Sequence, residues 1–261
     1  MKAQGATEYL VIVGVVLMIA LVCVALLVWP IETTNDVKQS QSDIKCGITK
    51  NAVPDIMQGL VGYWKFDEGS GTVTYDRKNS TSGTLVNGTA WAIGKSNTAA
   101  DFDGIDDYIN AGTNSITGTS PFTLSTWLKG RSNTNYALAV MVGNGAGSQS
   151  AWLGAYSPGT TIGGGIYGTN INSGITSEDE WHCATLTFSG GTGGTISLYV
   201  DGILKGTKTI TPNLRTTSIT FGNANVAPNY WYNGTVDEVL IYNRVLSADE
   251  IKFLSQYPGC P

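Results

Sequence analysis

Five aspartates in or beside glycine-rich turns are the residues of this sequence whose type suits metal binding. They are Asp67, Asp103, Asp106, Asp107 and Asp237. Hard cations such as Ca²⁺ take six to eight oxygen ligands from carboxylates and loop carbonyls. The alternative is that each aspartate accepts hydrogen bonds from nearby backbone amides, which aspartates in turns do routinely. The residues alone leave both interpretations open.

Three aromatic residues form a second candidate set, Trp152, Tyr156 and Tyr167. They fall in alternating runs that we expect to be middle strands, so they would line one face of a sheet. Aromatic rings on such a face can stack on sugars, although large aromatic side chains also pack readily against their own protein. We predict a ligand-binding face here, with simple packing as the alternative.

The sequence offers little for catalysis. Glycosidases of the retaining type need two carboxyl groups about 5–5.5 Å apart. Glu178, Asp179 and Glu180 have the right types, but they precede Trp181 in what reads as a solvated turn. His182 is the only histidine, and no nucleophile motif accompanies it. We therefore predict that the protein is not an enzyme.

Composition restricts the fold class and the partners. The chain has 33 glycines, only 13% charged residues and a formal net charge of -5. Glycine with many Thr, Ser and Asn residues is typical of strands and turns. Phosphate binding needs clustered Lys and Arg, and no such cluster is present, so nucleic acid is excluded as a partner.

Short alternating runs between Gly, Asn, Asp and Pro turn signals predict about eleven strands, and hence an all-β sandwich or barrel. The runs are 60–66, 99–102, 108–111, 122–128, 136–142, 152–156, 163–167, 181–188, 195–200, 218–221 and 236–242. Asp201-Gly202 is a strong hairpin signal because both positions tolerate positive φ. Ser247, followed by Asp249, Glu250 and an apolar stripe, predicts the start of a short helix.

The N-terminus contains an uncharged apolar run from Leu10 to Trp29. Its length suffices to span the hydrocarbon core of a membrane, so we predict a transmembrane helix. The sequence that precedes it, MKAQGATEY, resembles the class III signal peptide of archaeal type IV pilin-like proteins. That resemblance implies cleavage between Ala3 and Gln4 and pairing of Glu8 with the new amino group on a neighbouring subunit. The alternative is a plain anchor in which Glu8 stabilises the first helical turn.

Domain boundaries follow from these segments: leader 1–3, helix 4–29, polar linker 30–57 and a β-domain over 58–261. Cys46 and Cys260 flank the β-domain and invite a disulfide, the alternative being two unpaired thiols. Asn79, Asn87 and Asn233 begin N-glycosylation sequons, which favour an extracellular location for this part of the chain. We therefore expect the protein to be anchored in a membrane or to form part of a surface filament, with most of the chain outside the cell.

Several strings together resemble the laminin-G-like jelly-roll family, also called concanavalin A-like, over about residues 59–255. They are GYWKFDEGSG from Gly62, FDGIDDY from Phe102, FTLSTW from Phe122, WH from Trp181, LYVDG from Leu198 and GTVDEVLIYNR from Gly234. The resemblance implies a two-sheet antiparallel jelly-roll sandwich. It also implies one structural calcium ion, held by Asp237 with loop groups at Asp103 and Gly104.

Together these observations favour a cell-surface binding or adhesion protein. The helix would place it in a membrane or a pilin-like filament, and the jelly roll would bind a glycan or a surface protein. A membrane-tethered carbohydrate-active enzyme and a structural surface component without a specific ligand are the alternatives, because folds of this class serve all three roles.

Overall fold

The computed structural model describes one β-domain, over residues 56–79, 81–113, 116–132, 136–156, 159–215, 218–223 and 230–260. The predicted leader with Ala3, Gln4 and Glu8, the apolar run and Cys46 lie outside the described residues. Within the described ranges, none of the helical structure has the length and apolar character needed to cross a membrane.

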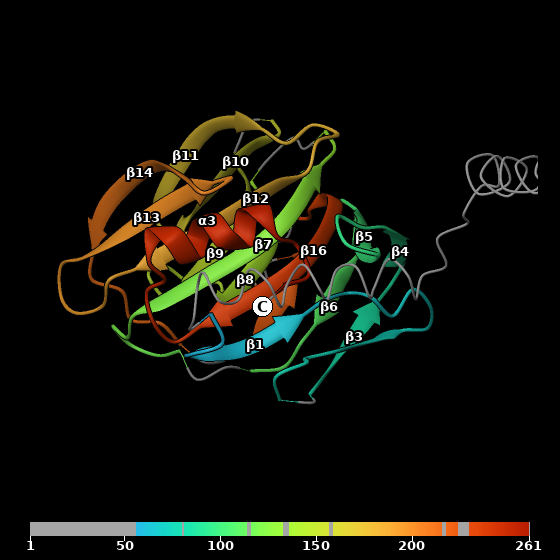
Figure 1. Ribbon diagram of the computed structural model, residues 1–261, viewed down its shortest axis with the longest axis horizontal. Coiled ribbons are helices and arrows are strands. Elements are labelled where there is room, and N and C mark those ends of the chain that lie inside the picture. The colour runs from blue at the N-terminus through green and yellow to red at the C-terminus, as the bar shows by residue number, and fades with distance from the viewer. Residues whose placement is uncertain are drawn as a thin grey trace, which may run out of the picture. The chain divides into compact units, whose positions relative to one another are not determined.

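The domain consists of two antiparallel eight-stranded sheets packed face to face (Figure 1), as predicted for a jelly-roll sandwich. Sheet A has the strand order β14-β13-β12-β7-β16-β5-β4, with β1 paired to β16, and sheet B has the order β11-β10-β9-β8-β15-β6-β3-β2. The strands of sheet A are β1 (Leu60–Trp64), β4 (Ala90–Ile93), β5 (Thr98–Asp103), β7 (Phe122–Gly130), β12 (His182–Phe188), β13 (Gly194–Val200), β14 (Ile203–Ile210) and β16 (Asn233–Tyr242). The strands of sheet B are β2 (Val73–Tyr75), β3 (Ser82–Val86), β6 (Tyr108–Asn110), β8 (Ala137–Gly143), β9 (Ser150–Tyr156), β10 (Thr161–Ile166), β11 (Thr169–Thr176) and β15 (Ile219–Phe221).

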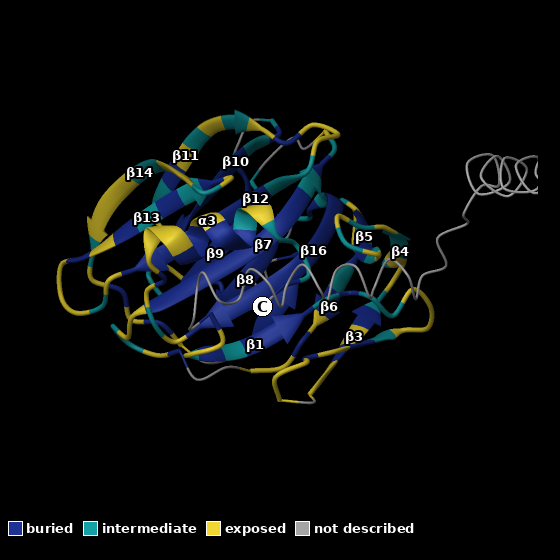
Figure 2. Cartoon of the chain, in the orientation of Figure 1, coloured by how far each residue is buried: buried dark blue, intermediate teal, exposed yellow. Residues whose placement is uncertain are grey.

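The main core fills the space between the two sheets. Because side chains alternate along a strand, every second residue points inward. Phe122 and Leu124 of β7 and Leu153 of β9 all belong to this core and are completely buried. Figure 2 shows the central strands almost wholly buried and the edge strand β14 largely exposed. Each buried Leu or Phe stabilises the fold by about 1.5–3 kcal/mol.

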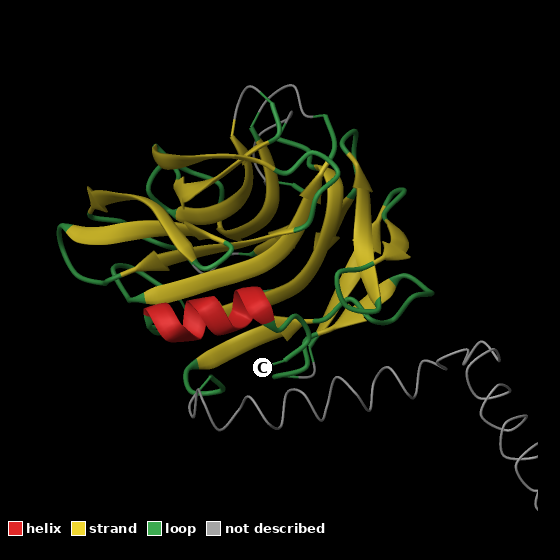
Figure 3. Cartoon of the chain, turned by 45° about the horizontal axis from the view of Figure 1, so that its top comes forward, coloured by secondary structure: helices red, strands yellow, loops and turns green. Residues whose placement is uncertain are grey.

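Helix α3 (Ala248–Gln256) covers the outer face of sheet A, where it packs on a second apolar cluster (Figure 3). Ile251, Phe253 and Leu254 of the helix are buried there against Tyr63 and other side chains of β1 and β16. Ser247 is the N-cap, with Glu250 completing a capping box. The helix start predicted from the sequence is thus confirmed.

The predicted hairpin at Asp201-Gly202 is also confirmed. Val200 pairs with Ile203, and the two turn residues have φ values of 53° and 77°. Positive φ at both central positions is the requirement of a type I′ turn, which suits the right-handed twist of paired strands.

Candidate functional site

The outer face of sheet B carries a separate aromatic cluster, which we call the tyrosine face. It consists of Tyr136, Trp152, Tyr156, Tyr167 and Tyr230. Trp152 is 2% exposed and packs with Leu138 and Met141 of β8. The four tyrosines are only partly buried and lie around it. The cluster therefore has an apolar base and a rim of phenol rings in contact with solvent.

The rings contact one another at right angles or tilted. The centroid of Tyr136 lies 6.0 Å from that of Trp152, 5.0 Å from Tyr156 and 6.2 Å from Tyr230, each in an edge-to-face arrangement. Tyr167 extends the row, because its ring centroid lies 6.3 Å from that of Tyr230. Edge-to-face pairs of this kind add about 0.5–1.5 kcal/mol each beyond the area that they bury.

Hydrogen bonds fix the orientation of three of the rings. The indole Nε1 of Trp152 donates to Oδ1 of Asn170 at 3.1 Å, and the hydroxyl of Tyr167 donates to that of Tyr230 at 3.3 Å. The bond to Tyr230, with burial, raises the pKa of Tyr167 to about 12. The hydroxyl of Tyr156, with burial, likewise raises the pKa of Tyr136. Both phenols are neutral at physiological pH.

Strand register explains why these side chains share one face. Trp152 of β9 lies opposite Met141 of β8 and Gly165 of β10. Two positions further along β9 is Gly154, which lies opposite Gly163. A Cβ atom at Gly163 would lie 2.8 Å from Cβ of Tyr156, so only glycine leaves room for that tyrosine. The glycine-rich sequence of β10 is therefore part of how the tyrosine face is built.

The three aromatics chosen from the sequence thus lie on one face, as predicted, whereas Tyr136 and Tyr230 were missed. Tyr136 directly precedes β8, and Tyr230 lies in the segment before β16. Neither has a sequence neighbour that signals a shared surface. Only the register of the folded sheet brings them to Trp152.

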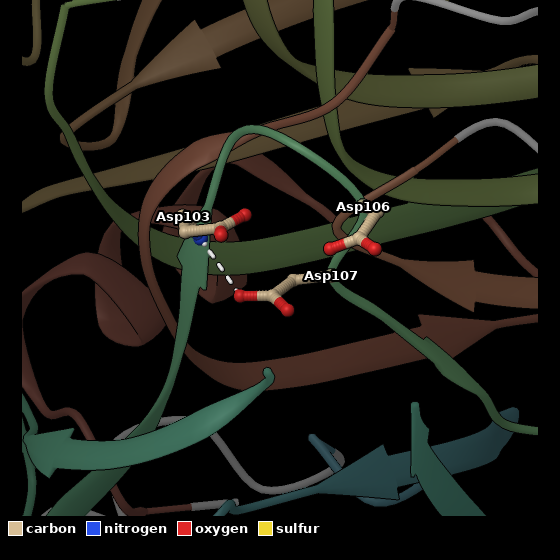
Figure 4. Close-up of side chains that lie close together, drawn as sticks. All are labelled: Asp103, Asp106 and Asp107. Atoms are coloured by element: carbon tan, nitrogen blue, oxygen red, sulfur yellow. Dashed lines mark hydrogen bonds between the residues drawn. The ribbon is translucent and has the colours of Figure 1, made fainter. Parts of the chain in front are cut away.

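A cluster of three carboxylates occupies the turn between β5 and β6 (Figure 4). Asp103, Asp106 and Asp107 each offer an oxygen, and these oxygens lie within 4.8 Å of one another. Asp107 is 3% exposed, and one of its oxygens accepts from the backbone N–H of Asp103 at 2.9 Å. The other oxygen, Oδ1, is buried without a hydrogen-bond partner. Burial raises the pKa of Asp107.

The calcium ligand set implied by the family resemblance is not brought together. In the register of β5 and β16, Asp103 lies opposite Asn233. Asp237 is four residues further along β16, which corresponds to about 13 Å of extended strand. Asp237 is also fully buried and accepts the backbone N–H groups of Ser96 and Glu238 at 2.9 and 2.8 Å. The prediction that Asp103, Gly104 and Asp237 form one metal site is therefore wrong.

Glu238, which was not among the predicted site residues, forms a buried acidic pair with Asp237 at a β-bulge of β16. It has a φ of 50° and accepts a hydrogen bond from the hydroxyl of Tyr63. Burial raises the pKa of Glu238 to about 7 and that of Asp237 well above its ordinary value. With exposed fractions of 1% and 0%, these carboxyls are inaccessible to a large ligand.

The amide nitrogens of the three predicted glycosylation sites all donate hydrogen bonds. Asn79 Nδ2 donates to the carbonyl oxygen of Val61 at 2.7 Å and to Asp76 at 2.8 Å. Asn87 Nδ2 donates to the carbonyl oxygen of Asp106 at 2.6 Å, and Asn233 Nδ2 to that of Ser132 at 3.1 Å. A sugar on Asn79 would remove at least one of its two internal bonds. Glycosylation at all three stays a prediction.

Two of the cysteines lie within the described residues. Cys260 is buried and disulfide-bonded. Its predicted partner, Cys46, lies outside the described residues, so the pairing itself stays a prediction. Cys183 is a free thiol, and burial raises its pKa to about 12.

The three carboxylates considered for catalysis lie in an exposed turn, as the sequence suggested. They are Glu178, Asp179 and Glu180. Neighbouring His182 bonds through Nδ1 to Asp201 at 2.7 Å, and Asp201 also accepts the backbone N–H of Cys183 at 2.9 Å. These bonds fasten the β13–β14 turn to the start of β12, which is a structural role.

Comparison with known families identifies the domain. A family model described as the concanavalin A-like lectin/glucanases superfamily matches residues 102–252. The chain belongs to this superfamily. A search of curated proteins found no match.

Solved structures with the same fold include several binding domains. Domain 4 of an extracellular arabinanase from Geobacillus stearothermophilus, solved with arabinotriose, is 18% identical with a TM-score of 0.59, covering 76% of this chain and 98% of that one. The binding domain of Paraclostridial Mosquitocidal Protein 1 is 18% identical with a TM-score of 0.61, covering 77% and 52%. A structure of botulinum neurotoxin type C, a toxin whose cell entry is described as dependent upon interaction with two ganglioside molecules, is 13% identical with a TM-score of 0.58. The match covers 78% of this chain and 52% of that one. The chain spans about half the length of the two toxin chains, and at these identities the likeness shows the fold alone.

Proposed function

We propose that this domain is a glycan-binding module and that its ligand contacts the tyrosine face. One observation carries the proposal: an apolar base around Trp152 is ringed by four partly exposed tyrosines on the outer face of sheet B. The helix that the structure describes, α3, covers sheet A instead. Phenol rings present flat apolar surfaces for sugar rings together with hydroxyl groups for hydrogen bonding.

The similar structures support a binding role without assigning a ligand. One was solved with arabinotriose, and another is described by its interaction with gangliosides. One fold hosts many functions, so it is the tyrosine face and not the fold that supports a glycan ligand. A protein ligand at the same face is the second possibility, since other neighbours are toxin binding domains.

The test is a glycan array followed by calorimetric titration of the best ligand. Tyr167→Ala removes a ring from the rim and should weaken binding about tenfold, or about 1.4 kcal/mol, consistent with loss of one stacking contact. Tyr75→Ala is the matched control, because Tyr75 is an exposed tyrosine of β2, at the opposite edge of the same sheet. Equal affinity in wild type and Tyr167→Ala would remove the proposed site.

Binding without catalysis is part of the proposal. The carboxylates at 178–180 are all exposed and lie in the turn that leads into β12. Incubating the protein with the polysaccharide that it binds and assaying reducing ends should give no release above a blank. Turnover would favour the alternative, a tethered carbohydrate-active enzyme, and absence of any ligand would favour a purely structural surface component.

We propose that the domain is displayed outside the cell by the apolar segment Leu10–Trp29. The supporting observations are the length of that run and the carboxylate of Glu8 before it. A pilin-like filament subunit would be cut between Ala3 and Gln4, whereas a simple membrane anchor would keep Met1. Mass spectrometry of the mature N-terminus distinguishes the two.

A calcium ion remains a proposal, with the β5–β6 turn as its place. Asp103, Asp106 and Asp107 would hold it, and the partnerless buried oxygen of Asp107 is the observation that favours it. Its chemistry there would be neutralisation of three adjacent carboxylates, which stiffens the turn. Thermal unfolding should occur at a lower temperature with a chelator than with calcium, and an unchanged midpoint would exclude the ion.

A further inference from the structure

The part of sheet B that carries the tyrosine face comes from two segments without charged side chains. Charged residues make up 13% of the chain, yet the sequence has no Asp, Glu, Lys, Arg or His between Arg131 and Glu178 or between Arg215 and Asp237. The first segment supplies β8, β9, β10 and β11, and the second supplies β15 and Tyr230. Every member of the tyrosine face belongs to one of these two segments.

The polar groups of the tyrosine face are therefore all neutral. They are the phenol hydroxyls, the indole N–H of Trp152 and the side-chain amide of Asn170. The raised pKa values of Tyr136 and Tyr167 keep these phenols protonated well above neutral pH. Asn172 continues the same outer face on the edge strand β11, because its Cα partner is Gly163.

An anionic ligand would gain little on such a surface. Moving a carboxylate, sulfate or phosphate from water onto an apolar site is costly unless a cation or several strong donors compensate. Recognition of such groups ordinarily uses Arg or Lys in charge-assisted hydrogen bonds. The net charge of -5 repels anions further. A neutral sugar loses only hydroxyl hydration, which phenols and amides replace.

We propose that the tyrosine face selects neutral glycans, meaning chains without carboxylate, sulfate or phosphate groups. This inference rests on the proposed glycan-binding function and adds the ligand class. Binding should be independent of ionic strength, because no ion pair takes part.

The decisive probe is one polymer in two charge states, polygalacturonic acid and its carboxyl-reduced form, alongside neutral arabinan, mannan and xylan. We expect binding to one or more of the neutral polymers. If polygalacturonic acid or its reduced form binds, the acid should bind at least tenfold more weakly than the reduced form. The affinity for a neutral polymer should change less than twofold between about 20 and 500 mM NaCl. Tighter, salt-sensitive binding of the acidic polymer would overturn the inference. If that binding is also weakened by Tyr167→Ala, the proposed function survives.

A gain-of-function variant tests the same point from the other side. Asn172 is exposed, and Asn172→Arg places a cation on the otherwise uncharged face, so it should create measurable, salt-sensitive affinity for polygalacturonic acid. Asn172→Gln is the matched control, since both changes remove the bond from Gly174 N–H to Asn172 Oδ1. No gain in Asn172→Arg would contradict the idea that missing charge is what excludes anions.

Arg215 is the basic residue at the border of the second uncharged segment, and it supplies an internal check. Its backbone N–H donates to the carbonyl oxygen of Gln149 at 3.2 Å, next to the start of β9, and its side chain is exposed. Arg215→Gln should leave affinity for the neutral glycan within twofold of wild type. A loss of tenfold or more would show that a charge contributes and would overturn the inference. If no glycan binding responds to Tyr167→Ala, the proposed function itself fails.

Discussion

The apolar side chains on the outer faces of the two sheets are covered in different ways. On sheet A, Tyr63 and Tyr242 are 6% and 0% exposed because α3 covers them. On sheet B, Trp152 is equally buried, but its cover is a rim of partly exposed phenols. The outer face of sheet A is thus covered by the domain's own helix, whereas the tyrosines on the outer face of sheet B remain in contact with solvent.

The largest effect is expected from breaking the cover of sheet A. Ile251 of α3 is 1% exposed, and Ile251→Ala should lower the free energy of unfolding by about 2–5 kcal/mol through lost burial and a cavity. Urea titration measures the loss. Glycan affinity below the unfolding transition should stay within twofold of wild type. A parallel drop in affinity would show that the two faces are not independent.

The buried carboxyl groups of Glu238 and Asp237 make the stability of the domain depend on pH. Burial raises the pKa of Glu238 from 4.5 to about 7, so between these values the folded domain holds a proton that the unfolded chain has released. The free energy of unfolding should therefore fall as pH rises from about 4.5 to 7, by roughly 3 kcal/mol, with Asp237 adding to the trend.

Glu238→Gln separates this contribution from the rest of the protein. The amide stays neutral at all pH values and still accepts from Tyr63, so urea titrations at pH 5 and pH 8 should differ less than in wild type. Glycan affinity should not follow pH in either protein, because the tyrosine face has no group that titrates in this range. An unchanged slope in Glu238→Gln would place the pH dependence elsewhere.

Trp152→Phe probes the base of the open face. The change removes the donor to Asn170 and part of the ring, which should cost about 1–2 kcal/mol of stability and weaken glycan binding by loosening Tyr136. Trp91→Phe is a matched control, because Trp91 Nε1 donates to the carbonyl oxygen of Gly71 at 2.9 Å, on β4 of sheet A. The control should lose stability but keep its affinity.

Sequence reasoning succeeded where a pattern is local. Alternation of apolar residues found eleven of the strands in the described residues, Asp201-Gly202 found a hairpin, and Ser247 found the helix start. Strands β2, β3, β4, β11 and β14 were missed. The first three are only three to five residues long, and β11 and β14 carry too few buried apolar side chains for alternation to mark them.

The candidate sites were predictable only in part, since they depend on register. Trp152 and Tyr156 share a face because they are four residues apart on one strand, which the sequence shows. Tyr136 and Tyr230 join them through pairing between distant segments, which it does not. The same limit explains why the predicted calcium site at Asp103 and Asp237 is wrong. The two residues lie on neighbouring strands, but Asp103 pairs with Asn233, four residues before Asp237.

The smallest expected effect comes from loosening the helix cap. Ser247→Ala removes the oxygen that accepts from Glu250 N–H and should cost about 1 kcal/mol, measured by urea titration. Ser255→Ala, in the last turn of α3, is the control and should change stability by less than about 0.5 kcal/mol. Glycan affinity unchanged in both would confirm that the cover of sheet A can weaken without disturbing sheet B.

The first described residues of the domain and the tyrosine face lie on opposite sides of the sandwich. Ile56, the first described residue, is buried in the α3 cluster, and β1 then joins β16 in sheet A. The chain therefore enters on the side of sheet A, and the tyrosine face lies on the far side of the sandwich. Contacts made through the start of the described domain and contacts made through the tyrosine face would therefore use opposite sides of the sandwich.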